Sequence, residues 1–122
     1  MYRLKHKGIA GMMVIMLCMV TCTVLAQDGM SFREVEDTTY ALYLKGDWKQ
    51  LQKVGREAIR NKIDYFYLRE RLGIAYYMQQ KYQLASPQFE KAYRFNSGDE
   101  LNNEYLFYSY SFDTRWNEAL KL

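Results

Sequence analysis

Apolar residues along most of this chain recur at the three- and four-residue spacing of an amphipathic helix, with short polar turns between the segments. The pattern predicts helices over residues 32–45 and 48–61, a third that ends near residues 79–80, a fourth from about residue 82, a fifth over 100–112 and a sixth from 113–114 onward. No segment has the alternation of a strand. The expected fold class is therefore all-α.

Capping residues support several of these boundaries. Ser31 and Glu34 fit a capping box at the first helix. Gly46 is placed to end that helix, Asp47 to cap the second, and Asp64 to cap the third. Pro87 is tolerated in a first turn, which places the start of the fourth helix at Tyr82 or nearer residue 85. The chain is expected to stop inside the sixth helix.

Residues 1–26 have the pattern of a secretory signal peptide. Three basic residues precede an apolar stretch, residues 8–25, and small residues precede a junction after Ala26. An uncleaved N-terminal anchor is the alternative, since the stretch is close to the length of a membrane span. Both interpretations export residues 27–122, and membrane contact is expected only through this segment if it is retained.

Removal of the segment changes the inventory of reactive residues. Cys18, Cys22 and His6 all lie within it, so residues 27–122 contain no Cys and no His. Thiolate metal sites, disulfides and Cys–His or Ser–His catalysis are thereby excluded there. Three basic residues also leave, which reduces 17 basic residues to 14 against 14 acidic ones. A zero net charge gives no reason to expect nucleic acid as a partner.

A set of small and aromatic residues recurs with a period of 34. Residues 72, 73, 76, 82, 85, 89 and 92 define one unit, Leu-Gly, Tyr, Tyr, Ala, Phe and Ala in order. The same frame gives Trp48 and Ala58 one period earlier, and Leu106, Tyr110, Trp116 and Ala119 one period later. This period and these residue types resemble the tetratricopeptide repeat, or TPR.

The resemblance implies a right-handed solenoid of helix–turn–helix units, two full and one truncated. The domain organisation is then a signal peptide over 1–26, a short segment over 27–31, and a TPR-like domain over 32–122 with repeats at 32–65, 66–99 and 100–122. The first repeat is degenerate, as terminal repeats often are. The open third repeat has three explanations: a longer envelope protein, end-to-end self-association, or a complete but poorly stable chain.

The resemblance further implies that the first helix of each repeat lines a concave groove. Carried over by register, one glutamate falls on that face in every repeat, beside a strip of tyrosines. The candidate protein-binding residues are Glu36, Tyr40, Tyr43, Glu70, Tyr77, Glu104 and Tyr108. They suit a protein or peptide segment with Lys or Arg and apolar anchors. The plainer alternative is a solvated helix face on which the tyrosines pack against each other.

These features predict a scaffold or adaptor in the periplasm or cell envelope of a Gram-negative bacterium. The alternative is a structural or sensory subdomain of a longer envelope protein, whose activity lies beyond residue 122. An enzyme is not expected, because the glutamates lie on successive repeats with no nucleophile–base pair beside them. No catalytic residue, cofactor or metal ligand is assigned.

Overall fold

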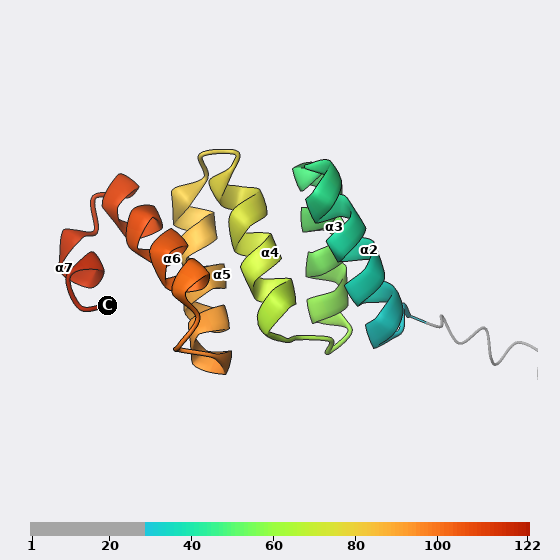
Figure 1. Ribbon diagram of the computed structural model, residues 1–122. Helices are drawn as coiled ribbons and strands as arrows, with labels where there is room; N and C mark the ends of the chain where they lie inside the picture. Colours follow the sequence, from blue (N-terminus) through green and yellow to red (C-terminus); the bar gives the residue numbers. More distant parts are fainter. Residues whose placement is uncertain (1–28) are drawn as a thin grey trace, which may run out of the picture.

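The computed structural model describes residues 29–122, and the part it describes is entirely helical (Figure 1). The predicted signal segment, with both cysteines and His6, lies outside these residues. The helices, in chain order, are α2 (Phe32–Lys45), α3 (Trp48–Arg60), α4 (Phe66–Tyr77), α5 (Tyr82–Phe95), α6 (Glu100–Phe112) and α7 (Trp116–Ala119). The all-α fold class is thereby confirmed. None of the helices in this range is long and apolar enough to cross a membrane.

The helices begin at intervals that repeat along the chain. α2, α4 and α6 start at residues 32, 66 and 100, and α3, α5 and α7 start at 48, 82 and 116. Both series therefore advance by 34 residues, the period of the sequence pattern.

Local capping explains where the first helices begin and end. Ser31 and Glu34 form the predicted capping box, with the Ser31 amide donating to the Glu34 carboxylate over 2.7 Å. Gly46 ends α2 in the left-handed conformation, with φ of 68°, which favours glycine. Asp47 then caps α3 by accepting a hydrogen bond from the amide of Gln50.

Three predicted boundaries are wrong. Asp64 does not cap α4, because its carboxylate is bound to the Arg69 guanidinium over 2.7 Å. α4 ends at Tyr77 rather than at residues 79–80. α7 begins after Arg115 and ends at Ala119, so the chain does not stop inside it.

Proline does not delay the start of α5. The helix begins at Tyr82 and contains Pro87 in its second turn. Proline lacks an amide hydrogen, so the carbonyl of Gln83 has no partner at the usual position four residues on. Both residues are exposed, which lets water bind that carbonyl.

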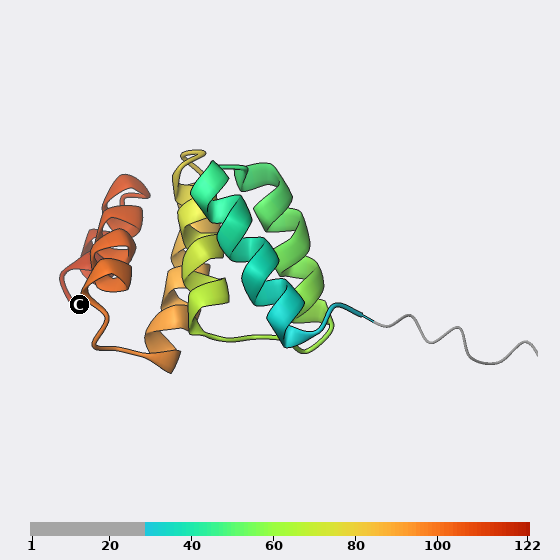
Figure 2. The same ribbon diagram turned by 45° about the vertical axis from the view of Figure 1, so that its right-hand side comes forward.

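The helices pack as successive pairs (Figures 1 and 2). α2 packs against α3, α4 against α5, and α6 against α7. α4 also contacts α2, α3 and α6, and α5 packs against α6 as well as α4. We call the side formed by α2, α4 and α6 the inner face, and the side formed by α3 and α5 the outer face.

α4 is the central helix, and its residues Glu70 to Tyr76 are all buried. Its packing requires a small residue at Gly73, because a Cβ there would lie 2.5 Å from the Phe89 ring of α5. Gly55 of α3 has the same role toward Leu72 of α4, at 2.7 Å. The predicted small positions Gly73, Ala85 and Ala92 are confirmed as buried contacts. Trp116, the aromatic residue of the 34-residue pattern at the start of α7, is 58% exposed.

Candidate protein-binding face

The seven candidate residues come from the three helices of the inner face. Glu36, Glu70 and Glu104 each occupy the fifth position of their helix, which places them at equivalent points along α2, α4 and α6. Their surroundings nevertheless differ, because α2 and α6 flank α4 on opposite sides. The three glutamates therefore differ in burial and in the groups that they contact.

Glu36 is occupied by a contact within the protein. Its carboxylate receives two hydrogen bonds from the guanidinium of Arg71 in α4, over 2.7 and 3.0 Å. Arg71 is buried and also donates to the hydroxyl of Thr39 over 3.1 Å. These bonds hold the pKa of Glu36 below its usual value. The pair ties α2 to α4 rather than presenting a free charge to a partner.

Tyr40 belongs to the same cluster. Its ring lies 5.1 Å from the guanidinium carbon of Arg71, and the ring of Tyr67 lies 5.7 Å from that carbon. Both distances are those of cation–π contacts. Both rings are about half exposed, so they cover Arg71 while remaining accessible.

Glu70 does not reach the surface as predicted. It is only 8% exposed, and burial together with the nearby carboxylate of Asp99 raises its pKa to about 7. Asp99 is held in place because it caps α6, accepting from the amide of Asn102 over 2.8 Å. The turn before α6 therefore covers Glu70. Its carboxylate is therefore not exposed to a partner in the way that the repeat register predicts.

Glu104 is the glutamate that remains available. It is exposed, and it forms no ion pair with any residue in the range 29–122. It lines a hollow of about 280 Å³ together with Tyr77, Leu101, Tyr105 and Tyr108. The sequence reasoning placed Tyr77, Glu104 and Tyr108 on one face, and the structure brings these three together.

Aromatic side chains from α4, α5 and α6 form a continuous cluster around this hollow. Tyr77 contacts Tyr105 and Tyr82 edge-on, with ring centroids 4.9 and 5.3 Å apart. Phe112 stacks on Tyr82 at 4.8 Å and lies 6.3 Å from Tyr108. We call these five residues the aromatic cluster. Tyr108 and Phe112 are 41% and 57% exposed, so the cluster continues to the surface.

Tyr43 joins the face through a second, shallower hollow of about 450 Å³. This hollow lies between α2 and α4 and is lined by Tyr43, Leu44, Trp48, Met78 and Tyr105, among others. Tyr43 packs edge-on against Trp48 at 6.1 Å. Since Tyr105 borders both hollows, the apolar surface extends from α2 to α6.

Sequence reasoning did not single out Tyr82, Leu101 or Tyr67 as site residues. Leu101 and Tyr67 occupy the second positions of α6 and α4, the helices that also carry predicted site residues. Tyr82 of α5 lies between the neighbouring helices, where it contacts Tyr77 of α4 and Phe112 of α6. Burial also raises the pKa of Tyr77 and Tyr105, whose phenols are protonated hydrogen-bond donors at neutral pH with or without this shift.

Comparison of the chain with protein-family models, with curated proteins and with solved structures gave no match. The binding chemistry of this face is therefore inferred from its own residues. The face offers exposed aromatic rings, two hollows lined largely by aromatic and aliphatic side chains, and at Glu104 a carboxylate that has no ion pair within residues 29–122.

Proposed function

We propose that this chain is a TPR-like protein-binding module that acts as a scaffold or adaptor in the cell envelope. In this proposal the helices form a right-handed solenoid, and the inner face holds a segment of a partner protein. The 34-residue spacing of both series of helix starts supports the repeat architecture. The pattern of residues 1–26 supports export.

The observation that carries the binding proposal is the exposed aromatic cluster beside Glu104. Tyrosine gives large contact area at a low cost in conformational entropy, which makes it frequent among the residues that dominate binding energy. Tyr108, Phe112 and the neighbouring Leu101 leave apolar surface exposed around the hollow. Burying that surface against a partner would stabilise the complex.

The charges of the three glutamates indicate which charged groups a partner segment should carry. Arg71 already neutralises Glu36, and Glu70 is covered, so Glu104 is the recurring glutamate left to pair with a cation. The partner segment that fits has apolar anchors for the two hollows and one Lys or Arg opposite Glu104. This requirement is narrower than the three-glutamate face expected from the repeat register.

Affinity measurements on matched variants test the proposal. A partner isolated with the wild-type chain is purified and titrated against Leu101→Ala/Tyr108→Ala. We expect at least about a thirtyfold loss of affinity, corresponding to about 2 kcal/mol for the removal of central anchors. The matched control is Tyr93→Ala, which removes a similarly exposed tyrosine of α5. Equal affinity of both variants would contradict the proposal.

A further inference from the structure

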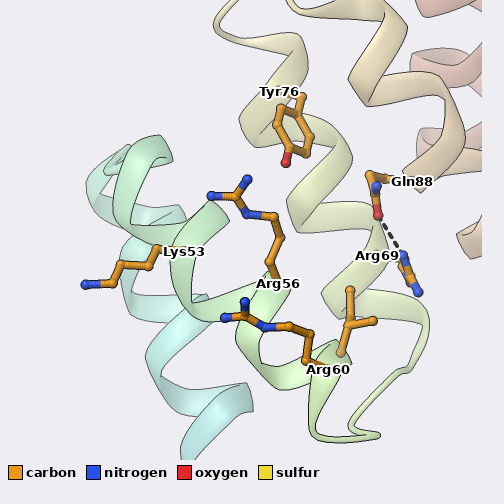
Figure 3. A pocket seen from close by; sticks show the side chains of 7 residues that line it. Lys53, Arg56, Arg60, Arg69, Tyr76 and Gln88 are labelled. Atoms are coloured by element: carbon orange, nitrogen blue, oxygen red, sulfur yellow. Dashed lines mark hydrogen bonds between the residues drawn. The ribbon is translucent and has the colours of Figure 1, made fainter.

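The outer face carries a basic hollow that the proposed function does not use. It has a volume of about 530 Å³ and lies between α3 and α5, with α4 beneath it (Figure 3). Its lining residues are Lys53, Arg56, Ile59 and Arg60 of α3, Arg69 and Tyr76 of α4, and Gln88 of α5. The volume is within the range of about 300–1,000 Å³ typical of small-molecule sites. We propose that this hollow binds the phosphate group of a phosphate ester.

The basic residues of α3 supply the positive charge. Lys53, Arg56 and Arg60 are spaced by three and four residues, which aligns them along one side of the helix. None of them forms an ion pair within the described residues, and Glu57 on the same helix is paired with none of them. Three unneutralised cations on one helix repel each other, and an anion bound beside Arg56 and Arg60 would relieve part of that repulsion.

Arg56 is the residue best placed to bind. Its Nε donates to the carbonyl of Gln52 over 3.2 Å, which fixes the base of the guanidinium and leaves both terminal nitrogens free. Figure 3 shows the Arg56 guanidinium reaching toward the hydroxyl of Tyr76, while Lys53 lies at the rim and points outward. A planar guanidinium held in this way binds two phosphate oxygens at once.

Arg69 has a different role, because it is already neutralised. Asp64 binds it at two points over 2.7 Å, and its Nη1 donates to Oε1 of Gln88 over 2.8 Å. Since Oε1 of Gln88 is the acceptor in that bond, the amide nitrogen of Gln88 is left as a donor. Arg69 therefore positions a neutral donor at the edge of the hollow.

The hydrogen-bond donors that line the hollow indicate which kind of anion fits it. No carboxylate lines the hollow, and the donors available are those of Arg56, Arg60, Tyr76 and Gln88. A carboxylate has two oxygens for these groups, whereas a phosphate monoester has three terminal oxygens and up to two negative charges. Ile59 and the ring of Tyr76 form an apolar wall for the carbon portion of the ester.

Titration calorimetry of the full-length chain tests the site. The probes are inorganic phosphate, glycerol 3-phosphate, and phosphatidylcholine vesicles with and without phosphatidic acid. The test variant is Arg56→Gln/Arg60→Gln, which retains good helix formers at exposed positions. The control is Arg33→Gln/Lys49→Gln, which removes the same charge from exposed positions outside the hollow. Circular dichroism confirms that both variants remain folded.

We expect the control to bind like wild type and the test variant to lose affinity about thirtyfold or more. Loss of glycerol 3-phosphate binding would identify a soluble ester as the ligand. Loss confined to vesicles with phosphatidic acid would identify a lipid headgroup. Absence of saturable binding to every probe, or equal loss in both variants, would overturn the proposal.

Discussion

Arg71 of α4 and Glu36 of α2 form a two-point ion pair across adjacent helices, with nitrogen–oxygen distances of 2.7 and 3.0 Å. Arg71 is buried beneath Tyr40 and Tyr67, and its guanidinium also donates to Thr39. One cation therefore satisfies polar groups of α2 while two exposed rings shield it from water. The pair links the first helix pair to the second.

Removal of one partner of this pair should destabilise the fold. We expect Glu36→Ala to lower the free energy of unfolding by about 1–3 kcal/mol, because it leaves the buried Arg71 charge without its counterion. Urea denaturation measures the change. The double variant Glu36→Leu/Arg71→Leu should recover part of the loss. If Glu36→Ala lowered the free energy of unfolding by less than about 0.5 kcal/mol, the ion pair would contribute no more than an exposed surface pair does.

Glu70 should make stability depend on pH. Its folded pKa of about 7 lies above its ordinary value of 4.5, so the folded chain binds a proton that the unfolded chain releases in this range. The stability that Glu70 contributes is therefore fully present below about pH 4.5 and is lost as pH rises through about 7. At about pH 8 we expect Glu70→Gln to be more stable than wild type by about 2–3 kcal/mol. Urea denaturation at several pH values measures this.

Glu104→Gln is the matched control for that experiment. Glu104 occupies the equivalent position of α6 but is exposed, so its substitution should not give the stabilisation at about pH 8 that we expect from removing the buried carboxylate of Glu70. If Glu70→Gln and wild type had parallel profiles between pH 4 and 8, the buried carboxyl would not be the titrating group.

α4 and α5 lie so close together at Gly73 that adding a side chain there should destabilise the fold. A Cβ there would lie 2.5 Å from the Phe89 ring, which is fully buried, so the ring or the helix would have to shift. We expect Gly73→Ala to destabilise the fold by about 1–3 kcal/mol, although alanine is the better helix former. Thermal unfolding measures the change. Gly98→Ala is the control, since the nearest atom there is 3.6 Å away, and equal effects would refute the packing argument.

The helix positions and the period were predictable because they depend on local signals. Ser31, Gly46 and Asp47 act on the chain within a few residues, and the alternation of small and aromatic positions directly encodes the helix contacts. Asp64 was misassigned because its actual partner, Arg69, competes for the carboxylate that capping would require. The Asp64 carboxylate could either cap the helix or pair with Arg69, and in the structure it pairs with Arg69.

The environments of the glutamates were not predictable from register alone. Equal positions in a repeat predict equal orientation, but α2 and α6 each have one inner neighbour whereas α4 has two. The covering of Glu70 by Asp99 depends on the path of the turn before α6, which no periodicity records.

The most direct test of the account is site-specific photo-cross-linking in the native cell. A photoreactive phenylalanine analogue is placed at position 108 on the inner face or at position 57 on α3, and the attached proteins are identified by mass spectrometry. The account predicts one defined protein product from position 108 that is absent from position 57, and that requires Leu101. Identical products from both positions, or a product at 108 that persists in Leu101→Ala, would contradict it.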